Sequence, residues 1–381
     1  MHSDFEDTAK NPKYGAPITK REAEILAIIR KNPMISHQEL ADMLGITRSA
    51  ASVHLTNLTK KGKIKGRGYI LEQPNYATII GAANMDINGF SFEPMVAGSS
   101  NPGRISLVPG GEARNLAENL ARLGINAKLM APIGGDMFGE KIVADCRALG
   151  IDTSDCLLLP NASTSLFMAF INSGGDMAMG LSDMRIEDNI TPEYVQRKSG
   201  ILAGSKVIVL GSGLPPETLQ YVLENFPQKE IIMDVGAVGK CKRFVHLLDR
   251  MCTLQLNRIE AEFISGISIV TAQDAIRAAK HISKMGPKRV FITLGVKGCA
   301  VVTPREEGFF HTRARRPVST TGVGQAYTAG IVYGAIYDLS LTETVQFAMA
   351  CSTLTLQSES AVNRALNLQA VEQVVLDNQE Y

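Results

Sequence analysis

Several features that would place this chain in a familiar class are missing from its sequence. No apolar run approaches the ~20 residues of a membrane-spanning helix, and the first residues lack the pattern of a secretory signal. The six cysteines form no C-x-x-C pair and the six histidines form no H-E-x-x-H motif, so disulfides and a zinc site have little support. We therefore expect a cytoplasmic protein with reduced cysteines and no membrane partner.

An excess of one charge is missing as well. Lys and Arg number 39, and Asp and Glu number 38, so the overall charge predicts no attraction to a polyanion. Any basic surface must therefore be local. The length of 381 residues allows two or three domains, and a hydrophobic fraction of 45% is ordinary for a globular protein.

The first 73 residues have the pattern of a small helical module. Residues 1–16 are polar and contain Pro and Gly, which is typical of a flexible arm. Helical periodicity begins near Thr19, and Ser36 with Glu39 forms the start signal of a second helix. Gly45 provides a turn, and Thr47 can cap a third helix that runs to about residue 61. Residues 64–71 alternate enough for a β-hairpin, so residues 17–73 predict a winged helix-turn-helix domain.

The candidate DNA-binding surface is the third helix and the segment after it. From Met43 to Leu71 the chain has no Asp or Glu. The side chains that suit phosphates and base edges are Thr47, Arg48, Ser49, Ser52, His54, Lys65 and Arg67. A solvated surface helix with a basic loop would have a similar composition. The complete helix-turn-helix-wing order favours binding of double-stranded DNA.

The remaining residues, 74–381, alternate between short apolar runs and helical patterns. Strands are predicted at 77–82, 127–133, 165–171, 207–210, 230–233, 253–256, 290–294 and 300–302. Helical patterns lie between several of them, at 113–123, 140–149, 216–224 and 272–285. This alternation predicts one α/β domain with a mostly parallel sheet flanked by helices. Ligands of such sheets bind beyond the carboxyl ends of the strands.

Two short motifs bring candidate substrate contacts to the first strands. Asp86 follows the first strand and suits sugar hydroxyls, although a turn Asp that bonds its own backbone is the more common reason for such a residue. Gly110 and Gly111 open a helix and allow close approach of a ligand to the backbone, or they only punctuate the start of that helix. Arg114 and Asn115 lie in its first turn, within reach of a ligand.

Two further motifs suit a nucleotide. Asn257 and Glu260 lie one helical turn apart, a spacing that suits a hydrated Mg²⁺ near phosphates, with Glu260 acting through water. An isolated N-x-x-E is nevertheless common. Thr293, Gly295 and Gly298 end a strand in a glycine turn, where a nucleotide can lie against the backbone.

The order of these motifs, together with Thr321-Gly322-Val323-Gly324, resembles the ribokinase-like PfkB family of sugar and nucleoside kinases over about residues 76–370. The run 81–89, residues 114–124 and the attached winged helix are most similar to pseudouridine-kinase-type members. The resemblance implies a ribokinase-like sheet with a small β lid, and a reaction that uses ATP and Mg²⁺. Because such lids often pair, it also implies a homodimer.

The resemblance further implies a role for each motif. Asp86, Gly110, Gly111, Arg114 and Asn115 would hold the sugar-like substrate. Asn257, Glu260, Thr293, Gly295, Gly298 and Asn363 would hold ATP and Mg²⁺, with Asn363 near the adenine. The backbone N–H groups of Gly322, Val323 and Gly324 would stabilise charge on the transferring phosphoryl group.

Position 325 departs from the family pattern, because Gln325 stands where the family has the aspartate that takes the proton of the substrate hydroxyl. An amide does not accept a proton near pH 7, and loss of such a base lowers the rate by ~10²–10⁴. Ser319, Glu112 and Gly211-Ser212-Gly213 also depart from the pattern, which is typical of relaxed catalytic function. Two functions remain open: an ATP-dependent sugar or nucleoside kinase, pseudouridine kinase among them, fused to a DNA-binding module, and a catalytically impaired, ligand-sensing transcription regulator.

Overall fold

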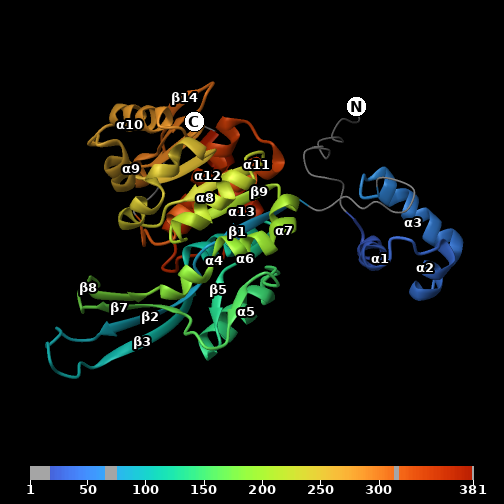
Figure 1. The fold of residues 1–381 in the computed structure, drawn as a ribbon, viewed down its shortest axis with the longest axis horizontal. Helices are drawn as coiled ribbons and strands as arrows, with labels where there is room; N and C mark the ends of the chain where they lie inside the picture. Colours follow the sequence, from blue (N-terminus) through green and yellow to red (C-terminus); the bar gives the residue numbers. More distant parts are fainter. Residues whose placement is uncertain (1–17, 65–74, 313–316, 380–381) are drawn as a thin grey trace, which may run out of the picture. The chain divides into compact units, whose positions relative to one another are not determined.

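The computed structural model describes residues 18–64, 75–312 and 317–379. The chain divides into two units, Met1–Pro74 and Asn75–Tyr381 (Figure 1). None of the described helices is long and apolar enough to cross a membrane. All six cysteines are unpaired, and four of them are buried.

The first unit contains the three predicted helices, α1 (Lys20–Lys31), α2 (His37–Leu44) and α3 (Arg48–Lys60). Thr19 and Ser36 start α1 and α2 with capping boxes, and the Thr47 side chain accepts a hydrogen bond from Ala50 N–H at the start of α3. Gly45 ends α2 with φ 61°, a conformation that favours glycine. The helices enclose a small core that includes Ile25, Leu26, Ile29, Leu40, Ala41, Ala51, Leu55 and Leu58. The predicted arm and nearly all of the predicted wing lie outside the described residues.

The second unit is built on an eight-stranded sheet with the order β14-β13-β12-β11-β10-β9-β1-β4. The first six of its strands along the chain are parallel, and the last two pair antiparallel at one edge. The strands are β1 (Tyr76–Ile80), β4 (Asn126–Met130), β9 (Val207–Gly211), β10 (Glu230–Asp234), β11 (Thr253–Asn257), β12 (Arg289–Thr293), β13 (Cys299–Val302) and β14 (Glu307–Phe310).

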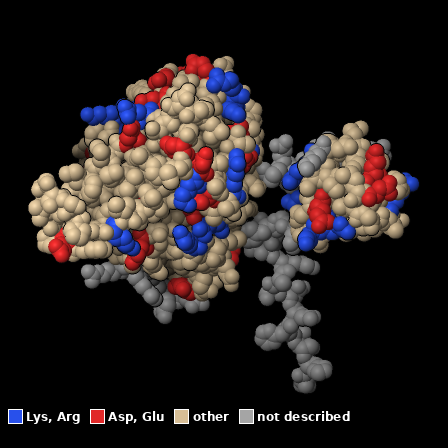
Figure 2. All heavy atoms as spheres, turned by 90° about the horizontal axis from the view of Figure 1, so that it is seen from below, with Lys and Arg blue, Asp and Glu red and all other residues tan. Residues whose placement is uncertain are grey.

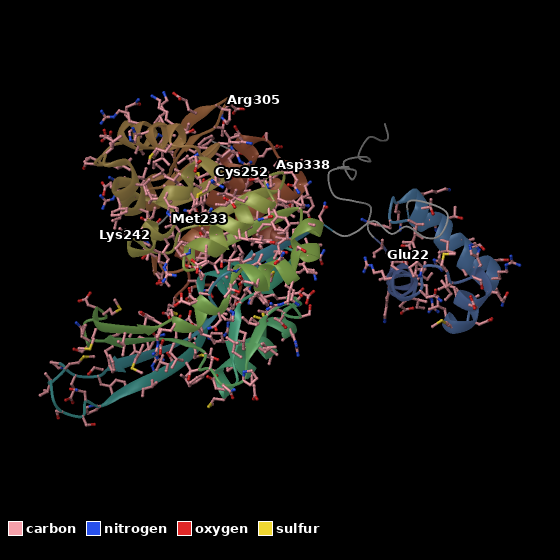
Figure 3. The ribbon with its side chains drawn as sticks, in the orientation of Figure 1. Glu22, Met233, Lys242, Cys252, Arg305 and Asp338 are labelled. Atoms are coloured by element: carbon pink, nitrogen blue, oxygen red, sulfur yellow. The ribbon has the colours of Figure 1, made fainter. Side chains whose placement is uncertain are left out.

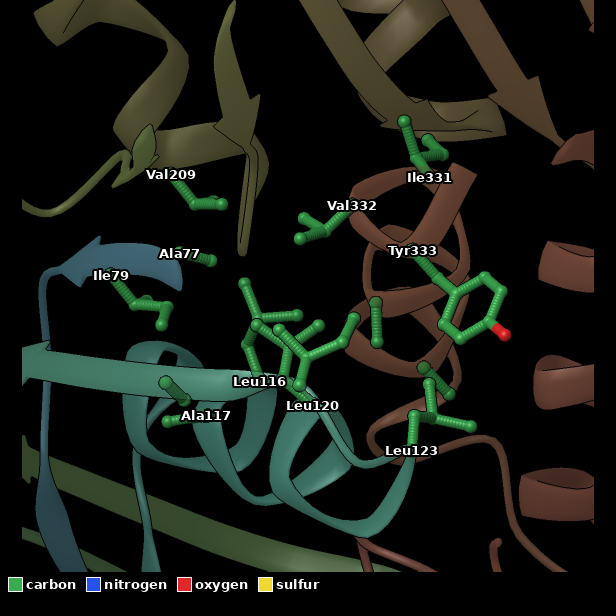
Figure 4. Close-up of a cluster of buried hydrophobic side chains, with 14 of the residues drawn as sticks. Ala77, Ile79, Leu116, Ala117, Leu120, Leu123, Val209, Ile331, Val332 and Tyr333 are labelled. Atoms are coloured by element: carbon green, nitrogen blue, oxygen red, sulfur yellow. The ribbon is translucent and has the colours of Figure 1, made fainter. Parts of the chain in front are cut away.

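Helices cover both faces of this sheet because successive strand residues point to opposite faces and both sets are apolar. One hydrophobic cluster joins the sheet to α4 (Glu112–Arg122), α5 (Met137–Ala148), α11 (Val323–Tyr337), α12 (Leu341–Leu356) and α13 (Leu368–Gln379). Figure 4 shows part of it, where Leu116 and Leu120 of α4 face Val332 of α11 and Val209 of the sheet.

The opposite cluster joins the sheet to five further α-helices and two 3₁₀-helices. These are α6 (Pro192–Arg197), α7 (Ser199–Gly204), α8 (Pro216–Asn225), α9 (Arg258–Ser265), α10 (Ala272–Lys284), η2 (Val238–Arg243) and η3 (Val245–Arg250). Two other 3₁₀-helices, η1 (Arg185–Asn189) and η4 (Gly295–Lys297), lie in connections.

A second, four-stranded sheet projects from the body of the unit (Figure 1). Its strands, in the order β3-β2-β7-β8, are β3 (Gly103–Gly110), β2 (Asn84–Ser91), β7 (Ser165–Ile171) and β8 (Met177–Asp183). A two-stranded sheet, β5 (Pro132–Gly134) and β6 (Leu157–Leu159), completes the fold. The projecting sheet has the place of the predicted lid, and it contains Asp86 within β2 rather than in a turn after β1.

Candidate active site

A cavity of about 610 Å³ opens beyond the carboxyl ends of β10, β11 and β12. It brings together eight of the residues that the sequence singles out, which are Asn257, Glu260, Thr293, Gly295, Gly322, Val323, Gly324 and Gln325. Gly298 lines a smaller adjoining pocket with Thr293 and Gly295. The cavity therefore has the size and the position of a ligand site in an α/β protein.

The floor of the cavity is the N-terminal end of α11. Gly322 precedes this helix with φ 77°, and a Cβ atom there would lie 1.8 Å from the carbonyl oxygen of Ala361. Only glycine allows that approach. Around Gly324 no atom lies within 4 Å of an added Cβ atom, so the first turn is open on that side. Free backbone N–H groups at a helix N-terminus form a binding site for a phosphate.

The Asn257–Glu260 pair begins α9 as a capping box. Glu260 N–H donates to Asn257 Oδ1 at 3.0 Å, and Asn257 N–H donates to Glu260 Oε2 at 2.8 Å. This local role explains the motif without any ligand. Glu260 Oε1, however, is buried and has no partner among the described residues. Burial, together with the charges of Asp234 and Glu112, raises the pKa of Glu260 to about 8.

A divalent cation fits this position only through water. The Glu260 side chain is fully buried, one oxygen is used by the cap, and the described residues include no group of three His, Cys, Asp or Glu that could hold a metal ion. Mg²⁺ retains most of its waters and needs few protein ligands, so the free Glu260 Oε1 can accept a hydrogen bond from one of those waters.

The turn after β12 borders the same cavity. Gly295 has φ 59° and Gly298 has φ 126°, and a Cβ atom on Gly298 would lie 2.0 Å from the carbonyl oxygen of Phe310. Thr293 Oγ1 donates to the carbonyl oxygen of Leu256 at 3.2 Å. Asn363, the residue expected near an adenine, uses both ends of its side chain within the protein: its Nδ2 donates to the carbonyl oxygen of Leu354 in α12, and its Oδ1 accepts from Ala365 N–H.

Gln325 lies in the first turn of α11 and contacts a residue that the sequence reasoning missed. Its Nε2 donates to Asp234 Oδ2 at 3.1 Å, and Thr328 Oγ1 donates to Asp234 Oδ1 at 2.8 Å. Asp234 is 2% exposed, and burial and the charge of Glu112 raise its pKa to about 6. An ionised carboxylate only accepts hydrogen bonds, so the amide NH₂ must face Asp234 and Gln325 Oε1 must face away.

The residues expected to hold a substrate meet at the base of the projecting sheet. A Cβ atom on Gly110 would lie 2.4 Å from Asp86 Oδ2, and Gly111, with φ 99°, packs against Ala82. Asn84 Nδ2 donates to Asp86 Oδ1 at 2.6 Å, while burial raises the pKa of Asp86.

Arg114 is buried, and its role is to orient its neighbours. It forms an ion pair with Glu118, and its Nη1 donates to Asn115 Oδ1 at 2.9 Å. Arg114 therefore fixes the Asn115 amide, whose remaining N–H groups can serve a ligand.

Three acidic residues beside this site were missed or misjudged from the sequence. Glu112, expected only as a departure from a family pattern, pairs with Lys240, whose Nζ lies 3.3 Å from its Oε2. Glu187 is buried close by, and burial, opposed by Lys240 and reinforced by Glu112, raises its pKa to about 7. Asp234 was also missed, although the sequence carried a signal for it: it is a polar residue directly after a predicted strand. Met233, its neighbour in the chain, is labelled in Figure 3.

In the first unit, the structure places Thr47, Arg48 and Ser49 on the exposed start of α3, while Ser52 and His54 are half-buried. His37 Nδ1 and Ser52 Oγ are 2.9 Å apart, so Ser52 also joins α2 to α3. Lys61 pairs with Glu22 at 2.7 Å, which neutralises one of the basic residues (Glu22 is labelled in Figure 3). Lys65 and Arg67 lie outside the described residues. Figure 2 shows side chains of both signs on the visible faces of both units.

Comparisons with known proteins agree with this architecture. Residues 75–367 match the family described as pfkB family carbohydrate kinase, and residues 18–65 match a winged helix-turn-helix DNA-binding family. The uncharacterized sugar kinase YeiI of Escherichia coli (strain K12) is 31% identical over 351 residues, covering 92% of this chain and 97% of that protein. The pseudouridine kinase of the same strain is 31% identical over 299 residues, covering 78% and 96%.

Solved structures show the same fold for the second unit. Arabidopsis thaliana ribokinase, complexed with ribose and ATP, superposes with a TM-score of 0.71 at 21% identity, over 80% of this chain and 99% of that one. A carbohydrate kinase from Agrobacterium tumefaciens gives 0.71 at 23% identity, over 79% and 97%. The predicted ribokinase-like fold and family resemblance are confirmed.

Proposed function

Because the chain belongs to the pfkB family of carbohydrate kinases, we propose that it uses ATP to phosphorylate a hydroxyl of a sugar or nucleoside, with pseudouridine as the first candidate. A relative of 31% identity is a pseudouridine kinase, which supports the nucleoside class. In this proposal ATP lies in the cavity beyond β10–β12, and the substrate lies between Asp86 and Asn115.

The observation that carries the proposal is the open start of α11 within that cavity. Phosphoryl transfer needs positioning and stabilisation of charge more than covalent chemistry from the protein. The N–H groups of residues 322–324 supply fixed positive dipoles where negative charge develops. When bound, Mg²⁺ would neutralise phosphate charge, held through water at Glu260.

In this mechanism, the part of the site that would hold the substrate hydroxyl has no general base at position 325. Asp86 can accept a hydrogen bond from a sugar hydroxyl, and Gln325 Oε1 can accept one from the hydroxyl that is phosphorylated. Gln325 cannot take the proton, so the hydroxyl must attack before it loses its proton to solvent or phosphate. We therefore expect a turnover rate that is ~10²–10⁴-fold lower than that of a related enzyme with a base.

Gln325 also favours a second candidate, a ligand-sensing transcription regulator with impaired catalysis. The contact from Gln325 to Asp234 holds the amide in place, which suits binding of a hydroxyl without reaction. Under both candidates the ligands and the DNA-binding module are the same, and only the chemistry differs.

An ATP-consumption assay over a panel of nucleosides and sugars separates the two candidates. We expect slow turnover in the native chain. Gln325→Asp restores a base, so its turnover rate should be ~10²–10⁴-fold higher. Gln325→Asn serves as a control, since it keeps an amide. Absence of turnover in every variant, combined with ligand-dependent thermal stabilisation, would leave only the regulator.

We further propose that the first unit binds double-stranded DNA through the start of α3. Arg48 is exposed and lies in the first turn of this helix, where side chains reach the major groove in helix-turn-helix proteins. A gel shift against the DNA upstream of its own gene should show salt-dependent binding that Arg48→Ala weakens. Lys20→Ala, an exposed change at the start of α1, is the matched control.

The projecting sheet supports the proposal of a homodimer. Its exposed side chains include Ile105, Leu107, Met177, Met179 and Leu181, an unusual amount of apolar surface to leave in water. A second copy of the same sheet would cover them. Light scattering should give the molar mass of a dimer for the native chain. For Leu181→Lys it should show weaker dimerisation.

A further inference from the structure

Glu112 carries a buried oxygen that no protein group satisfies. Its side chain is 9% exposed, Oε2 pairs with Lys240, and Oε1 has no hydrogen-bond partner among the described residues. The same holds for Glu187, which is 3% exposed and has a buried, unpartnered Oε1. Leaving a buried acceptor unpaired is unfavourable, more so for a charged group, so a ligand that donates hydrogen bonds would be stabilised here.

Glycines make room for these carboxylates. A Cβ atom on Gly211 would lie 2.7 Å from Glu112 Oε1, and one on Gly236 would lie 2.1 Å from Glu112 Oε2. A Cβ atom on Gly213 would lie 2.1 Å from Glu187 Oε2. The glycines at 211 and 213, which depart from the family pattern, therefore fit the two acids. Residues fitted to one another in this way indicate a built site rather than a decayed one.

The acids lie in a row that starts at the reacting end of the site. Gln325 contacts Asp234 at the end of β10, and Glu112 lies over the ends of β9 and β10, beside Gly211 and Gly236. Lys240 links Glu112 to the surroundings of Glu187 and Gly213. The row thus runs from Gln325, which lines the cavity, to Glu187.

The cations described beside this row leave Glu112 Oε1 and Glu187 Oε1 without a hydrogen bond. Lys240 is the cation that contacts Glu112, and nearby Arg243 donates to the carbonyl oxygen of Gly213 and lies 3.6 Å from Asp188. The Glu112 carboxylate accepts hydrogen bonds and donates none, so its free oxygen selects a partner with an N–H group.

Resting on the kinase-type site proposed above, we propose that Glu112, with Glu187 beside it, forms an acceptor wall that selects a nucleoside whose base presents an N–H donor, in preference to a plain sugar. Ribose would occupy the part of the site at Asp86 and Asn115, and the base would donate to the wall. Glu112 is in this view the specificity-determining residue.

Calorimetric titration of the full chain with pseudouridine, 1-methylpseudouridine and ribose tests this. Pseudouridine has two ring N–H groups, and the methylated form has lost one of them. We expect the native chain to bind pseudouridine at least tenfold more tightly than ribose. Glu112→Gln and Glu112→Val should each weaken pseudouridine binding by about 10- to 100-fold, as expected for loss of a hydrogen bond to a charged group, and should leave ribose unchanged. Glu217→Gln, an exposed acid on α8, is the matched control.

Titration with ATP and thermal unfolding of each variant distinguish failure of the acceptor wall from failure of the kinase-type site. If ATP and ribose bind but the Glu112 variants bind pseudouridine as the native chain does, or lose pseudouridine and ribose equally, the acceptor wall is wrong and the kinase-type site stands. If neither ATP nor any member of the panel binds the native chain, the proposed function fails and the wall fails with it. Equal loss of pseudouridine binding after Glu217→Gln would also contradict the wall.

Discussion

The candidate site has two ends that differ in how they relate to the family pattern. The nucleotide end is where ATP would lie, and the acceptor end is where the hydroxyl that receives the phosphoryl group would lie. At the nucleotide end, Asn257, Glu260, Thr293 and the glycines around α11 are the residues that the resemblance leads one to expect. At the acceptor end, Gln325 and Glu112 are not. The nucleotide end is held by local features, namely a helix cap, a glycine turn and a helix start.

The acceptor end is instead held by contacts between residues far apart in the chain. Glu112 fits against Gly211 and Gly236, and Gln325 binds Asp234. Substitutions that look like separate losses in the sequence therefore form one arrangement in space. The first end therefore follows the family pattern through local motifs, and the second departs from it through contacts between distant residues.

The largest effect is expected at the nucleotide end, for Gly322→Ala. The new Cβ atom would meet the Ala361 carbonyl and the residue would keep an unfavourable positive φ, so we expect a loss of about 4 kcal/mol in unfolding free energy, together with loss of ATP binding. Urea unfolding and calorimetric titration with ATP measure both. Gly324→Ala, which meets no atom within 4 Å, should unfold as the native chain does. Equal stability of the two variants would show that the start of α11 is not fixed by Gly322.

At the acceptor end, a smaller effect should depend on pH. The pKa of Glu187 is raised from 4.5 to about 7 in the folded chain, so the folded state retains a proton that the unfolded state loses. Its contribution to stability is fully present below pH ~4.5 and is lost as the pH rises through 7. The unfolding free energy of the native chain should fall between pH 5 and pH 8. In Glu187→Gln this fall should be smaller by roughly 2 kcal/mol.

Thermal or urea unfolding at several pH values measures this difference. Glu260 and Asp234 also have raised pKa values, so the native decline should be only partly removed by Glu187→Gln. The control Glu217→Gln should follow the native curve. Parallel curves for Glu187→Gln and the native chain would mean that Glu187 is not buried as a proton-retaining acid.

The smallest effect tests the fit between Glu112 and its glycines. Gly236→Ala should cost about 1 kcal/mol in the native chain, because within 4 Å the new Cβ atom meets only Glu112. In the Glu112→Ala background the same change should be nearly neutral. Gly239→Ala, with no atom within 4 Å, is the control. Additive costs in the double variant would contradict a fitted acceptor end.

Local signals in the sequence predicted much of the fold. The start signals at Thr19, Ser36 and Thr47 gave the first three helices, and buried apolar runs predicted seven of the eight main sheet strands within a few residues. The eighth strand, β14, was not predicted. In the projecting sheet, β2, β3 and β8 were not predicted, because β2 is mostly half-buried, β3 and β8 are mostly exposed, and none of them carries a strong apolar pattern.

The sequence by itself determined the family resemblance, the helix caps and the glycine turn at the start of α11, because each rests on motifs whose residues lie a few positions apart. The tertiary structure alone decided which polar residues meet. Gln325 and Asp234 are separated by 91 positions and Lys240 and Glu112 by 128, and only the packing of α11, β10 and α4 brings them into contact. Burial then removes water from these groups, which is why their pairing and pKa values could not be inferred from residue types alone.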